Sequence, residues 1–85
     1  MEKRVGKVTH FYTHLCVAVL DLTSELQQGD EIHILGRITD FIQRIDSLEI
    51  EHKKVDAASP GVEVALKMDD YVRKGDVVFK IVADM

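Results

Sequence analysis

The sequence has few of the features that form disulfide bonds or membrane-spanning segments. Its 85 residues include one cysteine, Cys16, one proline and no tryptophan. A single cysteine allows no disulfide within the chain, and a lone thiol fits a reducing compartment. No apolar run is long enough to span a bilayer, and no apolar targeting segment follows the first residues. These features predict a soluble cytoplasmic protein that does not enter a membrane.

Motifs for catalysis and nucleotide binding are also missing. The sequence has no G-x-x-x-x-G-K-[ST] loop, no G-x-S-x-G, no H-E-x-x-H and no C-x-x-C. His10, His14 and Cys16 would suit zinc only if a hairpin brought them together, and a buried cysteine beside two exposed histidines is the commoner arrangement. His33 is expected on the solvent side of a strand and His52 in a turn. We expect no catalytic residue, no metal and no cofactor, and therefore no enzyme.

Basic residues are fewer than acidic ones in this sequence. Fifteen acidic residues face eleven basic ones, which gives a net charge of −4. This balance argues against indiscriminate attraction to phosphate backbones. The basic residues fall in short groups with acids nearby, namely Lys3, Arg4 and Lys7, then Lys53 and Lys54, then Arg73 and Lys74. A solvated charged surface is favoured over a nucleic-acid track, although a locally basic face on an acidic protein keeps RNA among the partners considered.

The apolar residues that are present alternate with a period of two, which is typical of β-strands. Six segments carry this pattern or a short apolar run: residues 5–12, 16–22, 31–35, 39–50, 62–68 and 77–82. Ile32, Ile34, Val64 and Leu66 are expected to point inward. The alternation in residues 39–50 slips by one position between Ile45 and Leu48, which predicts a bulge. A helix across residues 39–51 is the alternative interpretation of that segment.

Turn signals separate these segments. Pro60-Gly61 is the strongest turn dipeptide, and Glu51-His52-Lys53-Lys54 is expected to form a tight turn. The segments Leu26–Ile32 and Val72–Val78 share the form apolar-x-x-Gly-Asp-x-apolar. They are interpreted as similar turns that enter strands. Short strands, regular turns and no 3.6-residue period predict a small barrel or sandwich.

The order of these elements resembles the second domain of elongation factor Tu and related translational GTPases. Five motifs carry the resemblance: Gly6-Lys7-Val8; Leu26 through Ile34, followed by Gly36; Leu48-Glu49-Ile50; Ala58-Ser59-Pro60-Gly61 through Val64; and Val72-Arg73-Lys74-Gly75-Asp76-Val77-Val78. A closer resemblance is to the C-terminal barrel of collagenase-like peptidase-family proteins, some of which act in RNA hydroxylation. It rests on Val5 to His10 and on Thr39-Asp40-Phe41. Both resemblances imply one domain over residues 1–85, folded as a closed six-stranded antiparallel Greek-key barrel.

The elongation-factor resemblance also implies binding residues. A glutamate that lies against the terminal adenosine of transfer RNA in that family corresponds to Glu49. An asparagine of the same pocket corresponds to Glu63, and this departure adds a negative charge that repels phosphate. Lys7 and Arg37 complete the candidate binding residues.

These observations give two functional hypotheses. The first is a non-catalytic adaptor that binds RNA or a protein of the translation or RNA-modification machinery. The alternative is a detached accessory subunit of a peptidase-like or RNA-hydroxylating enzyme. A homo-oligomer that uses an apolar barrel face is a third possibility. The GTPase domain is missing, so no nucleotide hydrolysis is expected, and the sequence names neither the partner nor the oligomeric state.

Overall fold

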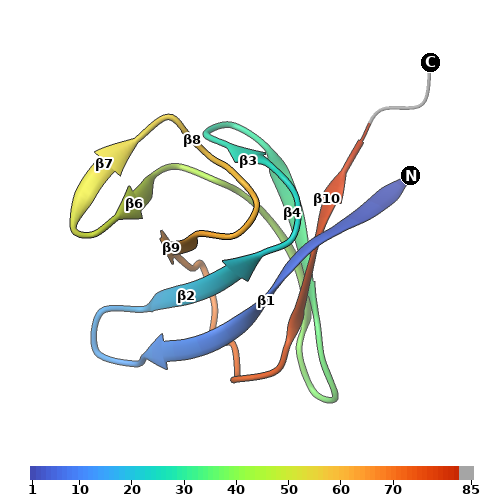
Figure 1. The fold of residues 1–85 in the computed structure, drawn as a ribbon. Coiled ribbons are helices and arrows are strands. Elements are labelled where there is room, and N and C mark those ends of the chain that lie inside the picture. Colours follow the sequence, from blue (N-terminus) through green and yellow to red (C-terminus); the bar gives the residue numbers. More distant parts are fainter. Residues whose placement is uncertain (83–85) are drawn as a thin grey trace.

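Ten strands and no helix make up residues 1–82, the part of the chain that the computed structural model describes (Figure 1). The strands are β1 (Glu2–Tyr12), β2 (Val17–Leu22), β3 (Leu26–Gln27), β4 (Glu31–Leu35), β5 (Asp40–Arg44), β6 (Leu48–Ile50), β7 (Lys53–Val55), β8 (Ala57–Ala58), β9 (Glu63–Lys67) and β10 (Val77–Ile81). The all-β prediction is confirmed, and the helix considered for residues 39–51 is wrong. Residues 83–85 of the predicted domain lie outside the described residues. Across residues 1–82 there is no helix with the length and apolar character to cross a membrane.

Eight of these strands form one antiparallel, strongly curved sheet in the order β5-β4-β10-β1-β2-β9-β6-β7 (Figure 1). Strands β3 and β8 pair separately, through Leu26 with Ala58 and Gln27 with Ala57. The main sheet ends at β5 and β7, so strand pairing alone does not close it. The resemblances predict a closed six-stranded barrel. Hydrogen bonds between the described strands do not close one.

Residues 39–50 explain why strand pairing leaves the main sheet open. The first part of this segment, β5, pairs with β4, whereas the second part, β6, pairs with β9 at the opposite region of the sheet. Residues 45–47 connect the two parts and belong to neither strand. Ile45 and Leu48 are both buried, as the slip in alternation requires. The predicted bulge is wrong, because the change of face coincides with a change of partner strand.

The side chain of Gln43 connects the two regions that strand pairing leaves separate. This residue of β5 is 5% exposed. Its Nε2 donates to the backbone oxygen of Lys67 at 3.0 Å, and its Oε1 accepts from the backbone N–H of Asp69 at 2.7 Å. Lys67 is the last residue of β9, and Asp69 follows it by two residues. One amide side chain thus supplies two hydrogen bonds between β5 and β9, where no strand ladder runs.

The core lies inside the curve of the sheet and is almost entirely aliphatic. All four residues expected to point inward, Ile32, Ile34, Val64 and Leu66, are buried. The other buried apolar residues are Val5, Val8, Ala18, Leu20, Leu22, Leu26, Ile45, Leu48, Ala58, Met68, Val72 and Val78. Burial of these side chains on one face is what fixes the register of each strand, because a shift by one residue would turn the apolar set to solvent.

The two Gly-Asp segments form the same turn, as the sequence predicts. Gly29 has φ 91° and Gly75 has φ 96°. In each turn the aspartate N–H donates to the backbone oxygen three residues earlier, at 3.2 Å for Asp30 and 2.9 Å for Asp76. Each aspartate Oδ2 then accepts from the backbone N–H of that same earlier residue, at 2.9 Å and 2.8 Å. A positive φ at the third position, which glycine adopts without strain, defines a type II turn.

Cys16 departs from its expected position. The sequence places it at the start of a buried strand, but β2 begins at Val17 and Cys16 ends the loop of the β1–β2 hairpin. Its φ is 55°, in the left-handed region, and its side chain is half-buried. Its backbone oxygen accepts from the N–H of Met68 at 2.7 Å, which ties this loop to the end of β9.

His33 links the beginning of β1 to the beginning of β5 from its place on β4. Its Nδ1 lies 2.9 Å from a Glu2 carboxylate oxygen, and its Nε2 lies 2.5 Å from Oδ1 of Asp40. The ring is half-buried rather than turned freely to solvent. The hydrogen bond to Asp40, followed by the one to Glu2, raises the pKa of His33 above its ordinary value of 6.5.

This raised pKa predicts a pH-dependent contribution to stability. The contribution is fully present below the unfolded pKa of His33 and is lost as the pH rises through the folded value. We expect His33→Gln to lower the melting temperature by a few degrees more near pH 5.5 than near pH 9, measured by differential scanning calorimetry. His14→Gln, in the exposed β1–β2 loop, is the matched control. An equal loss at both pH values would contradict the assigned charge pairing.

Residues 1 and 82 lie next to each other. The N–H of Val82 donates to the backbone oxygen of Met1 at 2.8 Å, and the amino group of Met1 donates to the oxygen of Val82 at 3.3 Å. These bonds extend the β1–β10 pairing. Strands β6 and β7 and the β1–β2 turn lie on the other side of the domain (Figure 1).

Candidate functional site

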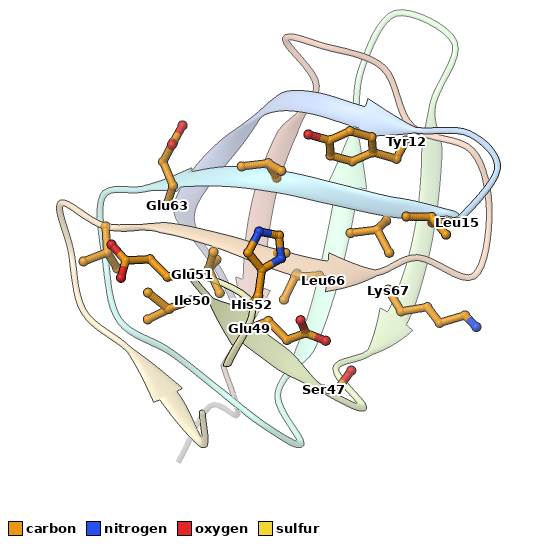
Figure 2. Close-up of a pocket in the computed structure, with 15 residues that line it drawn as sticks. Tyr12, Leu15, Ser47, Glu49, Ile50, Glu51, His52, Glu63, Leu66 and Lys67 are labelled. Atoms are coloured by element: carbon orange, nitrogen blue, oxygen red, sulfur yellow. The ribbon is translucent and has the colours of Figure 1, made fainter. Parts of the chain in front are cut away.

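A groove of about 940 Å³ lies over β2, β9 and β6 (Figure 2). Strand alternation explains its lining. Val17 and Val19 of β2 alternate with buried Ala18 and Leu20, so they face away from the core. On β9, Glu63, Ala65 and Lys67 occupy the corresponding outward positions. The groove is therefore built on the outer face of the sheet.

One end of the groove carries two exposed apolar side chains, beside Lys67 (Figure 2). Tyr12, the last residue of β1, is 48% exposed, and Leu15 in the following loop is 64% exposed. The loop is held by the bond from the N–H of Leu15 to the oxygen of Tyr12, at 3.2 Å, and by the bond from Met68 to Cys16. Two large apolar side chains are thus presented to solvent by a loop that is fixed at both ends.

The remaining rim is acidic. Glu49 on β6, Glu51 in the β6–β7 turn and Glu63 on β9 all line the groove, against one cation, Lys67. Glu51 and Glu63 are exposed and Glu49 is half-buried. Within residues 1–82, none of the three carboxylates forms an ion pair or a side-chain hydrogen bond. Their charges remain available to a bound molecule.

The turn at the acidic rim is strained. Glu51 and His52 form a two-residue connection between β6 and β7, with Ile50 paired to Lys53. Their φ values are 50° and 67°. Positive φ at both central positions is the geometry of a type I′ turn, which favours Asn-Gly. The expected tight turn is confirmed, but with residues that pay a conformational cost for it.

Replacing this pair by the favoured dipeptide should stabilise the domain. We expect Glu51→Asn with His52→Gly to raise the free energy of unfolding by about 1–2 kcal/mol, because the left-handed conformation costs non-glycine residues about that much. Urea denaturation measures the change. The control is Arg37→Asn with Ile38→Gly, since the β4–β5 turn contains no positive φ at these positions. Equal stabilisation by the control would show that the gain does not come from turn strain.

The structure brings two of the four candidate binding residues together. Glu49 and Glu63 both line the groove. Lys7 is exposed on β1, at a register position between Asp21 and Val77, and Arg37 is exposed in the β4–β5 turn. Neither Lys7 nor Arg37 lines the groove.

Other groove residues were not recognised in the sequence: Tyr12, Leu15, Glu51, His52 and Lys67. An exposed leucine in an otherwise polar hairpin loop was the available signal. The histidine–cysteine group considered for zinc does not gather, since no cluster of three potential ligands that would hold a metal occurs in residues 1–82. The His10 ring instead packs against Tyr12, with ring centroids 4.3 Å apart.

Comparisons with known proteins identify the fold. The chain superimposes on the C-terminal domain of a putative U32 peptidase from Geobacillus thermoleovorans with a TM-score of 0.88 at 23% identity, over 94% of this chain and 93% of that one. The fold is that of a U32 peptidase C-terminal domain. The selenomethionine variant of the same domain gives a TM-score of 0.85 at 23% identity, over 89% and 96% of the two chains. This agrees with the resemblance to collagenase-like peptidases, whereas the elongation-factor resemblance stays a prediction.

A sequence match points the same way. The chain is 37% identical over 76 residues to a Methanocaldococcus jannaschii protein named as an uncharacterized protease. The match covers 88% of this chain and 19% of that protein, so the chain spans about a fifth of the length of its curated relative. No family model matches the sequence.

Proposed function

We propose that this chain is a non-catalytic accessory domain that works with a peptidase-like catalytic part. The observation that carries the proposal is the match to about a fifth of a protein named as a protease. The likeness to a domain that is itself C-terminal in a putative U32 peptidase supports it. In both relatives the segment belongs to a larger protein, which is the arrangement expected of an accessory unit.

The interpretation as an adaptor for RNA or for the translation machinery has less support. Neither relative's name refers to RNA or translation. Glu49 and Glu63, the two candidates that lie in the groove, are accompanied there by Glu51. Three carboxylates around one groove repel a phosphate backbone rather than attract it.

We also propose that the domain is a variant of the six-stranded Greek-key barrel in which a side chain replaces the last ladder. The two hydrogen bonds from Gln43 to the end of β9 support this view. The short connection from β5 to β6 supports it as well, because a single segment serves both regions of the sheet. Such closure protects the borders that an open sheet presents to other chains.

Assembly in trans tests the accessory role. The probe is the M. jannaschii protein from which the 76 matched residues have been deleted. We expect this truncated protein to form a complex with the chain, detected by size-exclusion chromatography and isothermal titration calorimetry. The full-length protein, whose own segment occupies the position, is the control and should bind far more weakly.

Activity measurements complete the test. The chain alone should not hydrolyse fluorescein-labelled casein. Failure to bind the truncated protein would contradict the proposal, and so would proteolysis by the purified chain.

A further inference from the structure

The groove has two chemically different ends (Figure 2). Glu51 and Glu63 lie toward one end, with Glu49 nearer the middle, while Tyr12 and Leu15 lie at the other. Val17 and Val19 continue the apolar surface along β2. A bound molecule would therefore meet both apolar surface and negative charge within one groove.

The carboxylates of the groove determine which charge a bound molecule should carry. Glu49, Glu51 and Glu63 outnumber Lys67 in the groove. None of the three forms an ion pair within residues 1–82, although the register places Lys54 of β7 opposite Glu49. Polyanions are disfavoured by this field, whereas the ammonium of lysine or the guanidinium of arginine is attracted. An anionic lipid surface or a nucleic acid does not fit this side of the domain.

The apolar end adds a second requirement. Leu15 and Tyr12 are large side chains with about half or more of their surface exposed. Exposed apolar groups rimmed by polar residues mark interaction sites, and tyrosine contributes a large contact area at low entropic cost. A cation without an apolar neighbour would leave this end unused.

The backbone favours an extended occupant. Strand β6 pairs with β9 at only two register positions, Leu48 with Leu66 and Glu49 with Ala65. Beyond Glu49 the β6–β7 hairpin leaves β9, and Ile50 and Val62 both line the groove there. A volume of about 940 Å³ accommodates several side chains of a polypeptide segment.

We propose that this groove binds an extended segment of a polypeptide substrate in which an apolar side chain neighbours lysine or arginine. The cationic side chain lies among Glu49, Glu51 and Glu63, and the apolar one packs on Tyr12 and Leu15. The inference rests on the proposed accessory function and gives it a role, which is to recruit substrate for the catalytic part.

Fluorescence anisotropy with labelled ten-residue peptides tests the inference. The first peptide combines phenylalanine, leucine and lysine. A second has glutamate in place of each lysine, and a third has serine in place of each apolar residue. We expect the first peptide to bind at least about tenfold more tightly than the other two, and its affinity to fall as salt is raised.

Variants locate the binding site. Glu49→Gln, Glu51→Gln and Glu63→Gln combined should weaken binding of the first peptide roughly tenfold, since each exposed ion pair contributes a few-fold. The matched control is Glu31→Gln, Asp56→Asn and Asp69→Asn combined, which changes the net charge equally at residues that do not line the groove. Leu15→Ser tests the apolar end without disturbing the core. Circular dichroism verifies that each variant is folded.

Several outcomes would overturn the inference. They are no binding of the first peptide, equal binding of the glutamate peptide, equal loss in the control variant, or preferential binding of a single-stranded RNA oligomer. A different result is that the wild type binds no peptide and the groove variants no longer assemble with the truncated M. jannaschii protein. The groove would then be an interface with the catalytic part. That result overturns the inference and leaves the accessory function standing. Peptide binding without any assembly would contradict the accessory function alone.

Discussion

Replacing Gln43 by leucine is expected to lower the free energy of unfolding by about 1–3 kcal/mol, because two partly buried backbone groups lose their hydrogen-bond partners. The Gln43 amide donates to the backbone oxygen of Lys67 and accepts from the backbone N–H of Asp69. Leucine has a similar volume, so the loss comes from unsatisfied polar groups rather than from a cavity. Urea denaturation followed by circular dichroism measures the effect.

Gln27 offers a matched control for this prediction. It is an exposed glutamine on β3, and its amide reaches only the exposed Glu25 side chain, at 2.7 Å. Gln27→Leu should change stability by less than about 0.5 kcal/mol. If both variants lose the same amount, the contacts of Gln43 do not hold β5 to β9.

Gly36→Ala is expected to cost about 2 kcal/mol, a typical penalty for inserting a carbon into a filled site. A Cβ built on Gly36 lies 1.9 Å from Oδ1 and 2.6 Å from Cγ of Asp76. The aspartate is 5% exposed, and its Oδ2 accepts from the N–H of Arg73 at 2.8 Å. The carboxylate therefore moves aside only by giving up the bond that holds the Gly75 turn.

A double-mutant cycle isolates this contact. In an Asp76→Ala background the obstructing atoms are gone, so Gly36→Ala should cost less than about 0.5 kcal/mol, which leaves a coupling of at least about 1 kcal/mol. Thermal and urea unfolding of the four proteins give the coupling. Additive losses would mean that the close approach of Gly36 to Asp76 has no energetic role.

Alternation predicted much of the fold because one face of each strand is buried. Residues 31–35 are a strand at the expected bounds, and Ile32 and Ile34 point inward as predicted. The two Gly-Asp turns were also recognisable, since glycine and aspartate are required by local backbone geometry. In these cases the neighbouring residues along the chain determine the structure.

Features that depend on strand order could not be read from the sequence. Gln43 sits at an inward position of β5 and looks like an interruption of the apolar pattern until β9 is placed beside it. Cys16 adjoins an apolar run that is typical of a strand, but the hydrogen bond from the Met68 N–H to its backbone oxygen holds it in a turn. Local propensity yields to tertiary contacts at both positions.

The groove illustrates the same limit. The sequence points to Glu49 and Glu63 only through a resemblance to another family. Tyr12, Leu15 and Glu51 join them only because β2, β9 and β6 are neighbours in the sheet. These five residues are spread over more than half of the chain, and no single sequence motif contains them.

Because Met1 and Val82 are adjacent, the chain could be circularly permuted, which changes the order of the strands along the sequence but not their positions in the fold. A short peptide joining these two positions would close the backbone into a ring, and a new break in the exposed β4–β5 turn, at Arg37, would leave every strand pair intact. Such a rearranged chain keeps its groove on the side opposite the junction. The same geometry lets this unit be grafted at a single corner of another protein, with its groove directed outward.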